Sequence, residues 1–308
     1  MQALISFHLS ERKKMIQRCY LEITNICNLD CAFCAKTKRT KALMSGEQFE
    51  QLTDKLQGKI QFLYFHLMGE PCLHPLLADF VTRAKEKGFT PVITTNGTRL
   101  SQRQDLIAAK AYKIQISLHA HEGNLDEKIL MQNTDNVSSE NAALDNYIEQ
   151  VVCFAKAAAQ LGTLIILRLW NQGGYESLND KILQLLAQQL PQPWTERHDG
   201  WKLCENIYLE YDRIFQWPDS EREALPDPQF FCYALRNQIG VLVDGSVVPC
   251  CLDHEGDIIL GNLFEEELED ILASPRARAL YEAFSQHRAV EDLCCRCGYA
   301  KINKQYRQ

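Results

Sequence analysis

The chain alternates short apolar runs with stretches of helical periodicity. Six apolar or alternating runs predict strands at residues 19–24, 62–69, 91–97, 113–120, 164–171 and 206–211. Each of the last five follows a predicted helix, at about 45–58, 76–87, 100–110, 143–161 and 176–189. This alternation indicates βα units around a parallel sheet. We therefore expect an α/β fold, a partial (β/α)6 TIM-like barrel with right-handed crossovers.

Two polar segments interrupt this rhythm. Residues 121–140 are rich in Asn, Asp and Ser and predict a surface loop or lid, and the Pro- and Asp-rich segment 217–229 predicts a linker. We therefore expect a barrel core at 1–216, the linker at 217–229, and a small C-terminal α+β domain at 230–308.

The pattern changes after the linker. Residues 241–249 form two short apolar runs around Asp244-Gly245, which predicts a β-hairpin. Residues 264–284 predict a helix that is interrupted before Pro275.

Composition narrows the classes of partner. The chain has 308 residues, 46% hydrophobic and 24% charged, with a formal net charge of -7, as in ordinary globular proteins. This charge offers no basic field for nucleic acid or anionic membranes. The apolar runs are too short to cross a bilayer, and the N-terminus lacks the pattern of a signal peptide. We expect a cytoplasmic protein without nucleic-acid or membrane partners.

Thirteen cysteines are the main chemical feature. In a reducing compartment, short cysteine spacings indicate metal ligands or redox groups rather than disulfides. Cys27, Cys31 and Cys34 lie in "CNLDCAFC", directly after the first predicted strand, where α/β proteins build their active sites. Such thiolates hold zinc or iron–sulfur clusters. The candidates for the fourth ligand of a zinc site are His66, His74, Cys72 and Cys19.

The spacing C-x3-C-x-aromatic-C resembles the signature of the radical S-adenosylmethionine (SAM) superfamily, with Phe33 at the aromatic position. The resemblance implies that Cys27, Cys31 and Cys34 bind a 4Fe–4S cluster whose fourth iron chelates SAM. In that family an electron from the cluster cleaves SAM, and the 5′-deoxyadenosyl radical abstracts hydrogen from a substrate. The cofactor supplies the chemistry, and the protein supplies orientation and exclusion of water.

The tetrapeptide "MGEP", residues 68–71, follows the second predicted strand and resembles the family's G-G-E-P motif. Met68 replaces the first glycine, a mild departure because a backbone carbonyl can bind from any residue. The resemblance implies that Gly69 allows close backbone approach and that Glu70 accepts a hydrogen bond from the SAM ammonium group.

Polar residues also lie near the ends of the next three predicted strands. Asn96 precedes Gly97 and is either part of a simple turn or a contact of the bound nucleoside. Ser117 resembles a polar residue that contacts the SAM ribose or carboxylate. Arg168 is costly inside an apolar strand unless it is paired, and we expect the SAM carboxylate or a neighbouring acid as its partner. Asn171 is expected to face the ribose.

A second cysteine set lies near the end of the chain: Cys232, Cys250, Cys294 and Cys297. This pattern resembles the SPASM module of radical SAM enzymes, in its shortened twitch form. The resemblance implies that these four thiolates hold one auxiliary 4Fe–4S cluster, although zinc fits four thiolates too. Cys251 follows Cys250 and Cys295 follows Cys294. At these two places the choice of ligand stays open between the two neighbouring cysteines. The resemblance covers residues 17–215 and 228–300.

We therefore expect a radical SAM enzyme whose auxiliary cluster assists electron transfer. Its expected partners are SAM, a reductant such as flavodoxin or ferredoxin, and a small-molecule (sugar-like) or peptide substrate. The extension of about sixteen residues before the barrel is too short for a leader-binding domain, which favours a small molecule or a peptide held by the barrel alone. The alternatives are a non-catalytic zinc- or iron–sulfur-stabilised binding module on a degenerate barrel, and a cysteine redox sensor.

Overall fold

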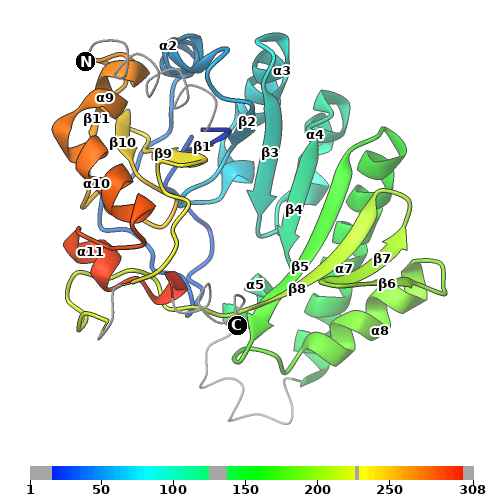
Figure 1. The fold of residues 1–308 in the computed structure, drawn as a ribbon. Coiled ribbons are helices and arrows are strands. Elements are labelled where there is room, and N and C mark those ends of the chain that lie inside the picture. The colour runs from blue at the N-terminus through cyan, green and yellow to red at the C-terminus, as the bar shows by residue number, and fades with distance from the viewer. Residues whose placement is uncertain (1–15, 125–136, 226–228, 301–308) are drawn as a thin grey trace.

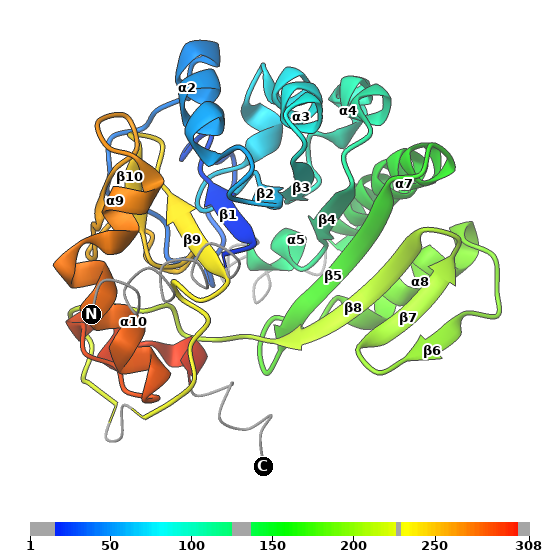
Figure 2. The same cartoon turned by 45° about the horizontal axis from the view of Figure 1, so that its top comes forward.

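One curved sheet runs through the protein (Figures 1 and 2). The computed structural model describes residues 16–124, 137–225 and 229–300. The strand order is β11-β10-β9-β1-β2-β3-β4-β5-β8-β7-β6. The strands are β1 (Arg18–Leu21), β2 (Phe62–Tyr64), β3 (Thr90–Thr95), β4 (Lys113–Ser117), β5 (Leu164–Gln172), β6 (Thr195–Arg197), β7 (Gly200–Cys204), β8 (Ile207–Arg213), β9 (Gln238–Val241), β10 (Ser246–Val248) and β11 (Gly261–Asn262).

The six strands β1, β2, β3, β4, β5 and β8 pair in parallel and form the expected partial barrel. Helices lie along the outer face of this curve (Figure 2). They are α2 (Gly46–Leu56), α3 (Leu77–Glu86), α4 (Gln104–Ala109), α7 (Val137–Gln160) and α8 (Asn179–Gln189), with short turns η1 (Pro71–Leu73), η2 (Leu100–Gln102) and α5 (Ala120–Gly123) at strand ends. No helix of the described part is both long and apolar enough to cross a membrane.

The helices form where the sequence supplies both an end signal and an apolar stripe. Helix α2 begins with a reciprocal capping box between Ser45 and Gln48. It then buries Phe49, Leu52 and Leu56, which recur on one face and pack against the sheet.

Two expectations need correction. The chain does not pass directly from α8 to the sixth strand, because the antiparallel hairpin β6–β7 intervenes and pairs with β8. All three residues of β6 are exposed and polar, so no apolar run marks this strand. The expected loop 121–140 is helical at both ends, in α5 and at the start of α7. Its middle, residues 125–136, lies outside the described residues.

The C-terminal part continues the barrel sheet. Strand β9 pairs in parallel with β1 and forms the expected antiparallel hairpin with β10. The helices here are α9 (Leu268–Ala273), α10 (Pro275–Ser285) and α11 (Asp292–Cys295). The break between α9 and α10 confirms the interruption before Pro275, which stands at the start of the new helix, the place that proline tolerates.

The two faces of the barrel sheet differ in chemistry. Residues such as Leu21, Leu63 and Ile165 point toward the helices and are fully buried in the main apolar core. Alternate residues point to the other face, which carries polar side chains such as Tyr20 and Arg168. We call the space in front of this inner face the lumen.

Candidate functional site

The structure brings the three cysteines of the N-terminal loop together just beyond the carboxyl end of β1. Burial, and next the nearby Cys34 and Cys27, raise the pKa of the Cys31 thiol to about 12. Burial also raises the pKa of Cys27, with smaller contributions from Glu70 and Cys34. The three sulfurs therefore lie close enough to interact electrostatically.

Helix α5 holds this loop in place. The Ala32 amide donates to the Gly123 carbonyl at 2.7 Å, and the Asp30 amide donates to the Asn124 side chain at 2.7 Å. A Cβ atom on Gly123 would lie 2.0 Å from the ring of Phe33. Only glycine therefore lets the helix approach the loop this closely. Sequence reasoning missed Gly123, although it is the first glycine after the fourth strand.

The turn after β2 packs on the chain that leads into the loop. Gly69 has a φ of +78°, and a Cβ there would lie 2.5 Å from the Thr24 carbonyl oxygen. The next amide, that of Glu70, donates to the Ile26 carbonyl at 2.8 Å. The expected close backbone approach at Gly69 is therefore an approach to this chain's own backbone at Thr24 and Asn25, two to three residues before the first cysteine of the loop.

The Glu70 carboxylate lies at the carboxyl ends of β2 and β3. It is 2% exposed and accepts hydrogen bonds from the Cys72 amide at 2.9 Å, the Thr95 hydroxyl at 2.6 Å and the Asn96 amide at 2.7 Å. Burial raises its pKa, and these donors act in the opposite direction. The Asn96 side chain lies 4.0 Å from the Cys27 sulfur. Glu70, Asn96 and the cysteine loop therefore form one assembly.

The remaining predicted residues lie on β4 and β5. Ser117 and Arg168 are partners in the register of these strands. Asn171 is 1% exposed and donates to the Tyr175 carbonyl at 2.6 Å and to the Asn179 side chain at 2.8 Å. These bonds tie the end of β5 to the start of α8, and the contact of Asn171 with a ribose stays a prediction.

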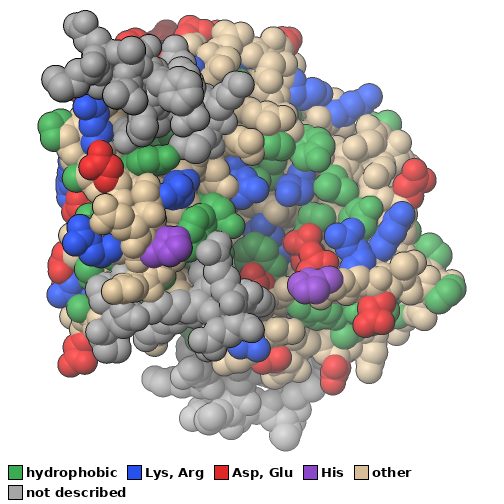
Figure 3. Space-filling view, viewed as in Figure 1, with side chains coloured by type: hydrophobic (Ala, Val, Ile, Leu, Met, Phe, Trp, Pro, Cys, Tyr) green, Lys and Arg blue, Asp and Glu red, His purple; other side chains and the backbone are tan. Residues whose placement is uncertain are grey.

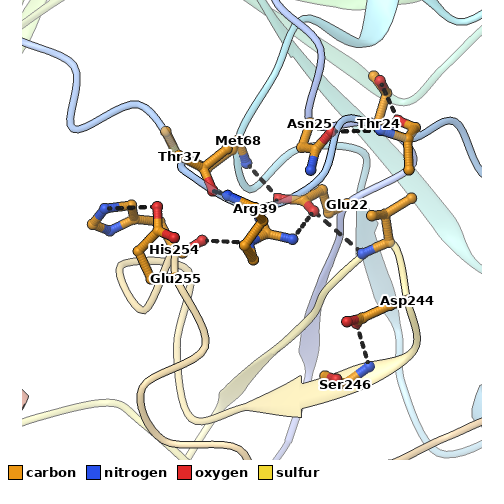
Figure 4. A network of polar contacts seen from close by, with 12 residues as sticks. Glu22, Thr24, Asn25, Thr37, Arg39, Met68, Asp244, Ser246, His254 and Glu255 are labelled. Carbon is orange, nitrogen blue, oxygen red and sulfur yellow. Dashed lines mark hydrogen bonds and ion pairs between the residues drawn. The ribbon is translucent and has the colours of Figure 1, made fainter.

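A buried ion pair that sequence reasoning missed joins the loop to the C-terminal part (Figure 4). Arg39 donates through both terminal nitrogens to the Glu22 carboxylate, at 2.8 and 2.6 Å. The same carboxylate accepts the Met68 amide at 3.3 Å and the Val243 amide at 3.2 Å, and the Arg39 Nε–H donates to the His254 carbonyl at 2.9 Å. A glutamate inside the apolar strand "CYLEIT" was the available signal, because a buried acid requires a partner.

The second cysteine set is also brought together. Burial raises the pKa of Cys250, and the effect is increased by Cys251 and by the other three members of the set, Cys232, Cys294 and Cys297. The two ambiguous neighbours differ. The Cys295 sulfur contacts the Ala289 carbonyl, whereas the Cys251 sulfur is hydrogen-bonded by Tyr20 of the inner face.

Both groups consist of thiols, the donors that iron–sulfur clusters take in proteins. Among the described residues, no three His, Cys, Asp or Glu side chains are grouped so as to hold a single metal ion. The donor chemistry of both groups fits iron–sulfur ligation. Thiolates from Cys27, Cys31 and Cys34 would hold one cluster.

Models of protein families match two parts of the chain. Residues 21–142 match the model of the radical SAM superfamily. This part of the chain is a radical SAM domain. Residues 232–298 match the SPASM model, an iron–sulfur cluster-binding domain. The radical SAM domain implies a 4Fe–4S cluster and SAM, and the SPASM domain implies auxiliary iron–sulfur binding.

Two curated proteins are similar in sequence. The tungsten-containing aldehyde ferredoxin oxidoreductase cofactor-modifying protein of Pyrococcus furiosus is 37% identical over 86 residues, 27% of this chain and 24% of that protein. The antilisterial bacteriocin subtilosin biosynthesis protein AlbA of Bacillus subtilis is 24% identical over 311 residues, 90% of this chain and 65% of that protein. The chain thus spans less than two thirds of the length of either relative.

Solved structures share the fold. Native anSMEcpe with bound AdoMet has a TM-score of 0.59 at 14% identity, over 94% of this chain and 88% of that chain. BtrN in complex with AdoMet and 2-DOIA has a TM-score of 0.55 at 18% identity, over 92% and 93%. These likenesses support the architecture of a radical SAM barrel with a C-terminal extension.

Proposed function

We propose that this chain is an enzyme that cleaves SAM reductively at a 4Fe–4S cluster held by Cys27, Cys31 and Cys34. A cluster held there would supply the one electron that splits SAM into methionine and a 5′-deoxyadenosyl radical, and the radical would abstract hydrogen from the substrate. The observation that carries this proposal is the grouping of the three loop thiols at the carboxyl end of β1.

The surrounding residues would position SAM. An ionised carboxylate has about four acceptor sites, and three protein hydrogen bonds to Glu70 leave one for the SAM ammonium. The Met68 carbonyl and Asn96 are proposed as further contacts, with Ser117 at the end of β4. Phe33, held over Gly123, would shield the cluster from water.

We further propose that Cys232, Cys250, Cys294 and Cys297 hold one auxiliary 4Fe–4S cluster in a module at 230–308, after a core at 1–216 and a linker at 217–229. Four thiolates close the coordination of such a cluster. With no open iron, this cluster would assist electron transfer rather than bind substrate directly.

The substrate is a small molecule or a peptide. The name of AlbA refers to the biosynthesis of a bacteriocin, subtilosin, which supports a peptide. A small one-electron donor such as flavodoxin or ferredoxin is the proposed reductant.

The test is formation of 5′-deoxyadenosine from SAM by protein reconstituted anaerobically with iron and sulfide and reduced with dithionite. The control is the triple variant Cys27→Ala/Cys31→Ala/Cys34→Ala. We expect product from the parent only. A loaded, reduced parent that neither binds SAM nor forms product would remove the proposal in favour of a non-catalytic binding module.

A further inference from the structure

Arg168 is a largely buried cation with an unpartnered buried donor. It lies on β5 with 8% of its surface exposed, and its Nε–H is buried without a hydrogen-bond partner among the described residues. Its guanidinium group lies over the ring of Trp170, with Cζ 3.8 Å from the ring centroid. That contact uses the charge of the guanidinium group but none of its five N–H donors.

No described acid fills this gap. Glu210 is the register partner of Arg168 on β8. Burial lowers the pKa of Arg168, and the charge of Glu210 makes the largest opposing contribution. Yet no ion pair or side-chain hydrogen bond joins Arg168 to Glu210 or to another residue of the described part. A buried cation without hydrogen bonds is costly. A group of this kind in a native protein indicates a missing partner.

Neutral donors face the same part of the lumen. Tyr20 and Tyr64, register partners on β1 and β2, are stacked with ring centroids 4.7 Å apart. Arg168 is among the charges that lower the pKa of both hydroxyls, against the larger raising effect of burial, so it lies near both. His66 packs edge-on against Tyr20, and burial followed by Arg168 lowers its pKa to about 3. In Figure 3 cationic side chains gather beside hydrophobic ones in the middle of this face.

The charges around the Arg168 side chain differ from those around the cysteine loop. The charges that act on the loop cysteines come from Glu70, Asp30, Lys36 and Lys41. The charge of Arg168 acts on Tyr20 and Tyr64, and also on His66, Lys113 and His119. Tyr20 in turn is hydrogen-bonded to Cys251 of the C-terminal part. Arg168 therefore points into the lumen, toward Tyr20 and Tyr64.

We propose that Arg168, together with the hydroxyl group of Tyr64, binds an oxyanion of the substrate inside the lumen. A guanidinium fork matches carboxylate and phosphate geometry, and the Tyr64 hydroxyl adds a neutral donor, whereas the Tyr20 hydroxyl is directed to Cys251. The stacked rings of Tyr20 and Tyr64 offer an apolar surface to the rest of the molecule. The substrate class is therefore an acid, either a carboxylate or a phosphate ester, which rests on the proposed function because it assumes that the lumen holds the substrate.

The experiment measures anion binding by the anaerobically reconstituted protein with SAM bound. Acetate, inorganic phosphate and chloride are titrated at constant ionic strength, and tryptophan emission is recorded because Trp170 touches Arg168. The variants are Arg168→Gln and Arg168→Lys. The matched control is Arg83→Gln, an arginine on the outer helix α3 that is paired with Asp79. SAM affinity is measured in parallel by equilibrium dialysis.

We expect a saturable change with acetate or phosphate but not with chloride, and the stronger of the two identifies the substrate's anionic group. Binding should weaken about tenfold or more in Arg168→Gln, less in Arg168→Lys, and not in Arg83→Gln. The SAM affinity of Arg168→Gln should stay within about twofold of the parent. Three results overturn the inference: no saturation in the parent, equal binding by Arg168→Gln, or a parallel loss of SAM affinity. Failure of SAM cleavage, in contrast, counts against the proposed function alone.

Discussion

Replacing Arg39 with methionine tests whether the ion pair in Figure 4 holds the cysteine loop against the C-terminal part. Glu22 is fully buried. Without Arg39 its carboxylate keeps only the Met68 and Val243 amides, at 3.3 and 3.2 Å, and loses the two shorter bonds of 2.8 and 2.6 Å. Removing one partner of a buried ion pair leaves an uncompensated charge, so we expect Arg39→Met to lower the free energy of unfolding by about 3–5 kcal/mol.

A second variant isolates the cause. In Glu22→Gln/Arg39→Met the buried group is neutral and its side-chain oxygen can still accept from the two amides. The double variant should therefore recover about 2 kcal/mol relative to Arg39→Met. A loss that came only from the missing packing of the Arg39 stem would not be recovered.

The assay is urea unfolding of the reconstituted protein, followed by far-ultraviolet circular dichroism. Arg83→Met is the control, because Arg83 and Asp79 are both about 40% exposed and such pairs contribute about 0–1 kcal/mol. Equal losses in Arg39→Met and Arg83→Met would refute the reasoning, since the Glu22 charge would then need no partner.

Three further outcomes follow from the site. Gly69→Ala should lower the free energy of unfolding by about 1–3 kcal/mol or more, since the new Cβ meets the Thr24 carbonyl at a positive φ; an unchanged urea midpoint would contradict this close approach. Burial lowers the pKa of His119 to about 4, below the value near 6.5 that histidine has in an unfolded chain. Lowering the pH from 7.5 to 5.5 protonates His119 in the unfolded chain only, which should lower the free energy of unfolding by about 1.3 kcal/mol. His119→Gln should lose that much less over this interval in the same unfolding assay, and equal losses would refute the assignment. Cys297→Ser should lower bound iron from about eight to about four atoms per chain, while Cys295→Ser should leave it unchanged; the reverse pattern in iron analysis would exchange their roles.

The barrel could be predicted from sequence because each of its strands is an apolar run with a helix beside it. The hairpin β6–β7 could not, because all residues of β6 are exposed. Strand β6 pairs only with β7, which in turn pairs with the edge of β8. Here pairing with a neighbouring strand, rather than burial of an apolar face, decides the conformation.

The cysteines were visible because metal ligands cluster at short spacings in sequence. The role of Arg39 was not visible, because its partner Glu22 is 17 positions away in sequence and its second contact, His254, is 215 positions away. Gly123 was missed for the same reason, since its role depends on a ring 90 positions earlier. Long-range contacts of this kind leave no local pattern.

The parallel pairing of β9 with β1 has a consequence for biosynthesis. Arg18 is paired with Gln238, so about 220 residues must be translated before the second edge of the first strand is covered. At about 5–20 residues per second, that interval is about 10 to 45 s. During this time the edge of β1 offers unpaired backbone groups to any other strand. The nascent chain is therefore most exposed to mispairing before its last quarter emerges, and slower initiation or an early chaperone should raise the yield of folded protein.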